Sequence, residues 1–119
     1  MLRGGVTRPY LIPIARTMTP EGRVKKRVAK FLAEQGIYYF FPMTGGYGKS
    51  GVPDIICCVR GRFVAIECKA GGREPTQLQV AQIGRIREAH GLAYVVNEST
   101  VGQTLEAIES LVTIWKANE

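Results

Sequence analysis

Two nearly continuous apolar runs, separated by a single glycine, constrain the fold of this 119-residue chain more than any other feature. The first run covers residues 54–60 and the second covers residues 62–69, on either side of Gly61. Runs of this length around one glycine are typical of two strands joined by a tight hairpin turn. Because nearly every position is apolar, we expect the resulting sheet to be covered on both faces.

Helical signals flank this hairpin. Thr19 is a predicted N-cap, and Pro20 occupies the first helical position that proline favours. Gly36 supplies the corresponding stop signal. The expected elements, in chain order, are a helix over 20–35, a strand over 38–41, the hairpin over 54–69, a helix over 76–89, a strand over 92–96 and a C-terminal helix beginning after Ser99 or Thr100. This order predicts an α/β fold in which a mixed central sheet is flanked by helices.

The length of the chain allows one folded domain. Residues 1–17 show no periodic pattern and contain several glycines and prolines, so we expect an N-terminal arm followed by a single domain over 18–119. No apolar run approaches the roughly 20 residues needed to span a bilayer, and we expect no membrane contact. The three cysteines (Cys57, Cys58 and Cys68) fall within expected strands without metal-ligand spacing, which predicts buried free thiols in a reducing, cytoplasmic setting.

The positive charge of the chain is concentrated at one end. Of the net charge of +6, residues 1–30 contribute eight Lys or Arg against one acid, whereas the remainder is almost balanced. Four cations of the first helix share one stripe at helical spacing, namely Arg23, Lys26, Arg27 and Lys30. We expect this stripe, together with Lys49 of a glycine-rich loop, to bind the backbone of a nucleic acid. A merely solvated basic face is the alternative.

The hairpin brings two carboxylates together. If Arg60 and Gly61 form a two-residue turn, Val59 pairs with Arg62 and Asp54 lies opposite Glu67. Facing carboxylates in an apolar sheet repel each other, and a divalent cation would remove that repulsion. Lys69, two residues after Glu67, points to the same face. The alternative is structural: Asp54 caps a strand, and Glu67 and Lys69 form an ion pair.

These residues resemble a known nuclease motif. Gly51-Val-Pro-Asp54, a short hairpin and Glu67-Cys-Lys69 are similar to the PD-(D/E)xK motif, which is found on a restriction-endonuclease-like core. With a preceding helical Glu21 and a following Thr76-x-x-Gln79, residues 18–98 resemble the virus-type replication-repair nuclease (VRR-NUC) family. The resemblance implies a Mg²⁺-dependent phosphodiesterase in which Mn²⁺ can substitute for Mg²⁺. The implied metal ligands are Asp54, Glu67 and the backbone carbonyl of Cys68, and the implied catalytic residues are Glu21, Asp54, Glu67, Lys69 and Gln79.

Two of these residues also have a structural explanation. Glu21 shares the core-facing side of its helix with Val24 and Val28, where it is either a partner of the helix dipole or a residue aimed at the site. Thr76 and Gln79 have the spacing of a capping box, which explains both residues without any catalytic role.

The expected function is that of a metal-dependent, structure-selective DNA endonuclease. The resemblance favours branched DNA, cut by a homodimer in the manner of a Holliday-junction resolvase. A sequence-specific, restriction-like nuclease is disfavoured because the chain has no evident recognition domain. The alternative from another class is a noncatalytic nucleic-acid-binding module of the same fold.

Overall fold

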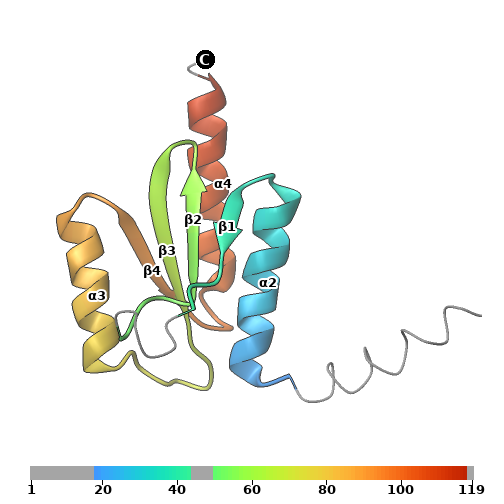
Figure 1. Ribbon diagram of the computed structural model, residues 1–119. Coiled ribbons are helices and arrows are strands. Elements are labelled where there is room, and N and C mark those ends of the chain that lie inside the picture. Colours follow the sequence, from blue (N-terminus) through green and yellow to red (C-terminus); the bar gives the residue numbers. More distant parts are fainter. Residues whose placement is uncertain (1–17, 44–49, 118–119) are drawn as a thin grey trace, which may run out of the picture.

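The computed structural model describes residues 18–43 and 50–117, which form one four-stranded mixed sheet flanked by three helices (Figure 1). In chain order the elements are α2 (Pro20–Glu34), β1 (Tyr38–Phe40), β2 (Ile55–Val59), β3 (Arg62–Cys68), α3 (Gln77–Glu88), β4 (Leu92–Val96) and α4 (Val101–Ala117). The strands are ordered β1-β2-β3-β4, with antiparallel pairing up to β3 and parallel pairing between β3 and β4. The predicted α/β class and mixed sheet are confirmed. The predicted arm over residues 1–17 lies outside the described residues.

Local signals explain where α2 begins and ends. The Thr19 hydroxyl accepts a hydrogen bond from the Gly22 N–H at 2.9 Å, which satisfies one of the free donors of the first turn. Gly36 follows the helix with a φ of 69°, a left-handed conformation that glycine adopts without strain. These end signals were readable from the sequence because they depend only on neighbouring residues.

The main core lies between the sheet and the helix pair α2 and α4. Its fully buried side chains come from all these elements and include Val28, Leu32, Ile55, Ile66 and Ile108. Burying a side chain of this size contributes roughly 1.5–3 kcal/mol. This face of the sheet therefore supplies most of the apolar stabilisation. Trp115 lies at helical spacing from Ile108, Leu111 and Val112, but its side chain is outside the described side chains.

The opposite face is covered only in part, which corrects the expectation of a sheet buried on both sides. Here α3 packs over β3 and β4 to form a small second core of Ile56, Ala65, Ile83 and Ala93. One twelve-residue helix is too narrow to cover four strands, so the same face of β1 and of the Cys58 end of β2 stays open. As a result Cys58 is exposed, and the prediction that all three thiols are buried is wrong for this residue.

The hairpin has the predicted register. Val59 pairs with Arg62, and the two turn residues Arg60 and Gly61 both have positive φ (52° and 90°). Positive φ at both positions is what a type I′ turn requires, and this turn matches the twist of its strands.

The start of α4 is held by hydrogen bonds that the sequence pattern did not single out. The helix begins directly after Thr100, as expected, but the Asn97 side chain accepts from the N–H groups of both Ser99 and Thr100. The Thr100 hydroxyl in turn accepts from the Asn97 N–H at 3.0 Å.

Within the described part of the chain, no helix is both long enough and apolar enough to cross a membrane.

Candidate active site

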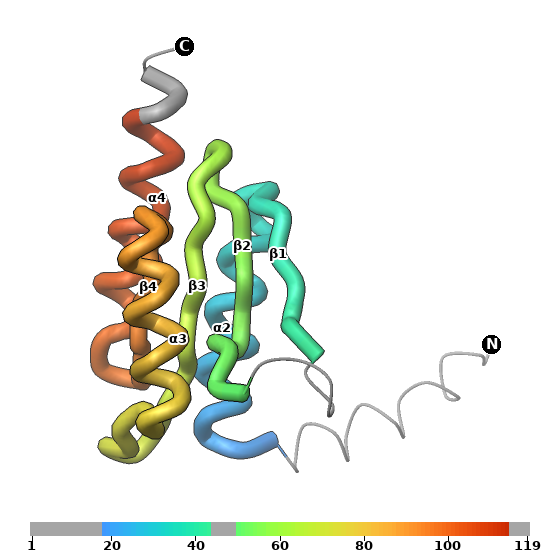
Figure 2. The backbone as a smooth tube through the Cα atoms, turned by 60° about the vertical axis from the view of Figure 1, so that its left-hand side comes forward, coloured from blue at the N-terminus to red at the C-terminus, as the bar shows by residue number. Residues whose placement is uncertain are grey.

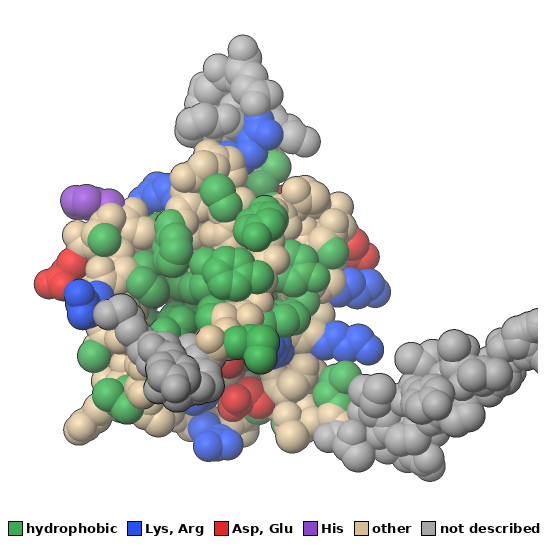
Figure 3. Space-filling model, in the orientation of Figure 1, with side chains coloured by type: hydrophobic (Ala, Val, Ile, Leu, Met, Phe, Trp, Pro, Cys, Tyr) green, Lys and Arg blue, Asp and Glu red, His purple; other side chains and the backbone are tan. Residues whose placement is uncertain are grey.

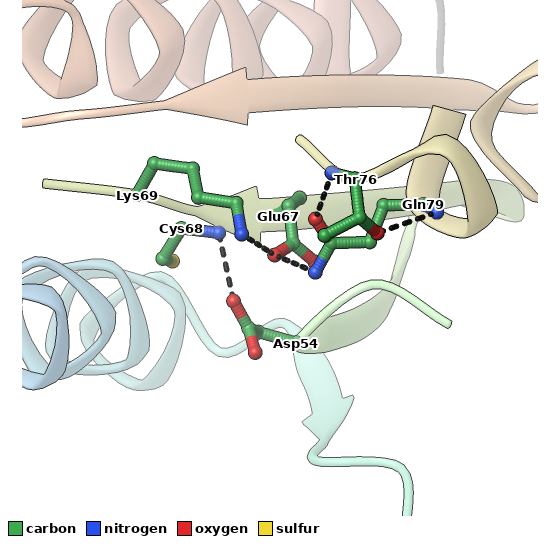
Figure 4. Close-up of polar contacts among 6 residues, drawn as sticks. All are labelled: Asp54, Glu67, Cys68, Lys69, Thr76 and Gln79. Atoms are coloured by element: carbon green, nitrogen blue, oxygen red, sulfur yellow. Dashed lines mark hydrogen bonds and ion pairs between the residues drawn. The ribbon is translucent and has the colours of Figure 1, made fainter. Parts of the chain in front are cut away.

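Four segments meet at one end of the sheet. Figure 2 shows the N-terminal end of α2, the start of β2, the end of β3 and the first turn of α3 at the same end of the molecule. Figure 4 shows the side chains that the last three of these segments bring together. The hairpin register and the capping of α3 are what place these groups near one another.

Glu67 is the centre of this arrangement. It lies on β3, opposite Val95 of β4, and only 1% of its surface is exposed. Its Oε2 atom accepts a hydrogen bond from the Gln79 amide at 2.8 Å and lies 3.4 Å from Lys69 Nζ. Its Oε1 atom is also buried but has no hydrogen-bond partner among the described residues. A buried carboxylate oxygen without a partner is costly, and an ion or water would satisfy it.

The electrostatics of Glu67 agree with this geometry. Burial, and to a lesser extent the negative charge of Asp54, raise the pKa of its carboxyl from 4.5 to about 7. The Lys69 ammonium opposes both effects, so it offsets only part of the cost of a buried negative charge. A cation bound between the carboxylates would favour the ionised form.

Asp54 is tied to the end of β3 through the main chain. Its Oδ2 atom accepts a hydrogen bond from the Cys68 N–H at 2.8 Å. The backbone pairing between β2 and β3 ends at Ile55 and Ile66, so Asp54 and Glu67 are not a paired position of the sheet. The predicted register is thus right up to Ile55, and a side-chain hydrogen bond continues the contact in place of the ladder.

Gln79 caps α3, as the sequence predicts, and also contacts Glu67. Its Oε1 atom accepts from the Thr76 N–H at 2.8 Å, and its own N–H donates to the Thr76 hydroxyl, which completes the predicted capping box. Because the amide oxygen is held by Thr76, the amide nitrogen points toward Glu67 and donates to it. The cap therefore also orients the Glu67 carboxylate.

Gly51 explains how the loop before β2 reaches this position. It has a φ of 79°, and a Cβ atom on it would lie 2.5 Å from the backbone carbon and oxygen of Leu78. The loop therefore runs against the first turn of α3, where a side chain would not fit. This contact holds the segment that leads to Asp54.

The start of α2 supplies two further charges. Glu21 is half-buried, as its place on the core-facing side predicts, and its Oε1 atom is buried without a hydrogen-bond partner in the described residues. Its charge adds to the raised pKa of Glu67. Lys25, one turn later, lowers the pKa of the Cys68 thiol. Burial is the larger effect, and the pKa of this thiol is raised to about 12. Sequence reasoning missed Lys25, although its i+4 spacing from Glu21 was an available signal.

The donor set fits a hard divalent cation. In residues 18–43 and 50–117, no three His, Cys, Asp or Glu side chains are grouped as a metal site. Magnesium does not need three such side chains, because it commonly binds one or two carboxylates and completes its shell with water and phosphate oxygens. The two orphaned oxygens, one on Glu67 and one on Glu21, are consistent with such a site. The backbone carbonyl of Cys68 stays a predicted ligand.

A pocket of about 400 Å³ opens beside these residues. Its lining includes Glu21 and Arg73, the second of which sequence reasoning also missed. The turn that carries Arg73 is held by Gly71, whose N–H donates to the Glu98 carboxylate. A pocket with a cation next to the carboxylates could accept a phosphate group of a substrate.

The predicted basic stripe forms one surface, separate from the carboxylates. Arg23, Lys26, Arg27 and Lys30 are all exposed and line a single pocket of about 370 Å³ on the outer side of α2. Its role in nucleic-acid binding stays a prediction. The other cation of that prediction, Lys49, lies outside the described residues.

Comparison with known proteins adds no family to this picture. No protein-family model matches the chain, and no curated protein matches it significantly.

Proposed function

We propose that the protein is a Mg²⁺-dependent DNA endonuclease with a PD-(D/E)xK core of the VRR-NUC type, in which Mn²⁺ can replace Mg²⁺. The observation that carries the proposal is the environment of Glu67. A buried carboxylate, with one oxygen unpartnered, lies between Lys69 and a second carboxylate, Asp54. A purely structural ion pair between Glu67 and Lys69 would need neither the second carboxylate nor the unpartnered oxygen.

Each residue of the site would have a separate role in cleavage. A bound Mg²⁺ would supply Lewis acidity toward the scissile phosphate and a lower pKa for an attacking water. Lys69 would orient that water and offset the negative charge that builds on the phosphate. Gln79 would hold Glu67 in one orientation through its fixed amide. The unpartnered oxygen of Glu21 would accept a hydrogen bond from water at the site.

The proposed substrate is branched DNA, bound through phosphate contacts of the α2 stripe. Contacts of this kind fix position and orientation but carry no sequence information, which suits an enzyme that selects shape. We further propose that the protein acts as a homodimer in the cytoplasm, with the four-way junction as one substrate that a two-fold dimer would cut.

A cleavage panel tests the proposal. Wild type should cut branched, flapped, single-stranded or linear duplex DNA to different extents with Mg²⁺ or Mn²⁺, and should not cut with EDTA. Asp54→Ala and Lys69→Ala should lower the rate by about 10²–10³-fold, as removal of one charge-stabilising group typically does. Their DNA affinity should be largely retained, because phosphate contacts elsewhere dominate binding.

The matched control is Glu106→Gln, which changes an exposed carboxylate of α4 and should leave the cleavage rate unchanged. Full activity of Asp54→Ala with Mg²⁺ would refute the site. Binding of DNA without any cleavage by wild type would favour a noncatalytic module.

A further inference from the structure

The part of the sheet that α3 leaves open carries exposed aromatic rings. Tyr38, Phe40 and Phe63 are 72%, 46% and 47% exposed. Tyr38 pairs with Cys58, which pairs in turn with Phe63, so these residues form one row across β1, β2 and β3. Phe40 belongs to the adjacent row, with its ring centroid 6.3 Å from that of Tyr38. Figure 3 shows this face as a continuous area of hydrophobic side chains at the centre of the molecule.

The face is too small to hold a second protein by itself. Three strands about 4.8 Å apart and four residues of about 3.4 Å each span on the order of 200 Å². A stable protein–protein interface buries about 800 Å² on each partner. Flat aromatic rings on a small sheet face do, however, match single nucleobases, which stack on such rings in several single-strand-binding folds.

The aromatic face lies on the same side of the sheet as the candidate active site. Residues 63, 65 and 67 of β3 all point to this side, because side chains alternate along a strand. Ala65 is buried beneath α3, so a bound strand would pass over β1, where Phe40 is exposed, and not directly along β3. Phe63 and Glu67 are four residues apart, about 14 Å along the strand. A stacked nucleic-acid strand rises about 3.4 Å per nucleotide, so about four nucleotides or more would connect a phosphate at Glu67 with a base at Phe63.

A cation borders the aromatic face. On the side of α3, a pocket of about 380 Å³ is lined by Phe63 and Arg85. Rings beside a cation are a combination with which proteins hold unpaired strands, since the rings contact bases and the cation contacts a phosphate.

We propose that this face is a stacking platform for unpaired bases, and that the substrate carries a single-stranded segment of about four nucleotides next to the cleaved bond. The inference rests on the proposed nuclease function and narrows its substrate class. Flapped, gapped and splayed DNA meet the requirement, whereas a fully paired duplex does not. A four-way junction meets it only where base pairs at its crossover open.

Binding without cleavage tests the platform. Fluorescence anisotropy with a labelled 12-nucleotide oligodeoxythymidine in EDTA should give a dissociation constant that rises about 5- to 150-fold for Tyr38→Ala and for Phe63→Ala. Affinity for a 20-base-pair duplex should change less than twofold. Tyr38→Phe keeps the ring and should bind like wild type. Ile114→Ala removes an exposed apolar side chain of α4 and is the matched control.

Unchanged single-strand affinity in both alanine variants would overturn the platform, as would equal losses for single strand and duplex. A fall in sedimentation mass without a loss of single-strand affinity would instead show that the face joins two copies of the chain. The proposed function fails separately: if wild type cuts no DNA with Mg²⁺ but the alanine variants still lose single-strand affinity, the platform stands and the nuclease assignment does not.

Discussion

Glu67 is a carboxylate that the fold makes costly to ionise. Its pKa is about 7 in the folded protein against 4.5 as the ordinary value. For an acid with a raised folded-state pKa, the stabilising contribution is fully present below pH 4.5 and is lost as the pH rises through 7. Without metal, the free energy of unfolding should therefore fall by on the order of 3 kcal/mol between pH 4.5 and pH 8. Urea denaturation in EDTA at several pH values measures this change.

Glu67→Gln separates this effect from other titrations. The amide has no charge to ionise, so the variant should lose most of the pH dependence and should be more stable than wild type at pH 8 without metal. Mg²⁺ at pH 8 should stabilise wild type, because a ligand that binds only the folded state raises its stability, but should not stabilise the variant. The same pH slope in both proteins would contradict the raised pKa.

Part of the candidate active site could be predicted from the sequence because three of its residues belong to one hairpin. Asp54, Glu67 and Lys69 lie on one hairpin, whose register follows from its two turn residues and the alternation of strands. Lys25 and Arg73 approach the site only through the packing of α2 and a turn against the sheet end. The spacing of Lys25 from Glu21 was a local signal for the first of them, but no local rule joins either segment to the hairpin, so the sequence did not identify these two residues.

Among the elements, β2 shows what an apolar pattern leaves undecided. Its sequence Ile-Ile-Cys-Cys-Val is apolar at every position, which predicted burial on both faces. The side facing α2 and α4 is buried, but the other side is covered only where α3 reaches it. The length of α3 was predicted correctly, whereas its placement over β3 and β4 depends on tertiary packing that the pattern does not encode.

Alkylation of the cysteines checks which side of β2 is open. Burial raises the pKa of the Cys57 thiol, and of the Cys68 thiol, to about 12, so both stay protonated and inaccessible at pH 8. The thiolate is the reactive form, and Cys58 is exposed. Iodoacetamide on the native protein should therefore modify Cys58 alone, as read by peptide mass spectrometry, whereas all three should react in urea. Rapid native modification of Cys57 would mean that the strand faces are reversed.

The contact between the loop before β2 and the first turn of α3 can also be tested. Gly51→Ala would place a Cβ atom against the Leu78 backbone at a φ of 79°, so it should destabilise the protein by roughly 1–3 kcal/mol or more. It should also lower the cleavage rate, because the displaced loop carries Asp54. Thermal unfolding and single-turnover cleavage measure the two effects.

Gly36→Ala is the matched control for the loop. Gly36 has a similar φ of 69°, but no atom lies within 4 Å of a Cβ built there. It should show only the conformational penalty of about 1 kcal/mol and an unchanged rate per folded molecule. Equal effects of the two substitutions would show that the close approach to α3 is unimportant.

In the whole molecule, the basic stripe of α2 and the carboxylates of the candidate active site lie on different surfaces. The four cations of α2 face outward, while the carboxylates gather at the end of the sheet near the start of the same helix. If the proposed function is right, each site would break one strand of a duplex, and a chain of 119 residues would cover only a short stretch of DNA. Two cuts related by a two-fold axis, as a four-way junction requires, would need two chains in a symmetric dimer.

The predicted dimer can be tested directly. Sedimentation at micromolar concentration should give about twice the chain mass of 13.1 kDa. Junction DNA should then yield paired, symmetric nicks. Candidate interface segments in the sequence are residues 10–14, the aromatic run over 38–41 and Trp115. Residues 10–14 and the Trp115 side chain lie outside the described part of the chain, and Tyr38–Phe40 forms an exposed edge strand. Because the aromatic face falls well short of 800 Å², the dimer would have to bury other surface as well. A monomer that cuts only flaps or single strands would exclude the dimer while leaving the carboxylate site intact, since every group of that site comes from one chain.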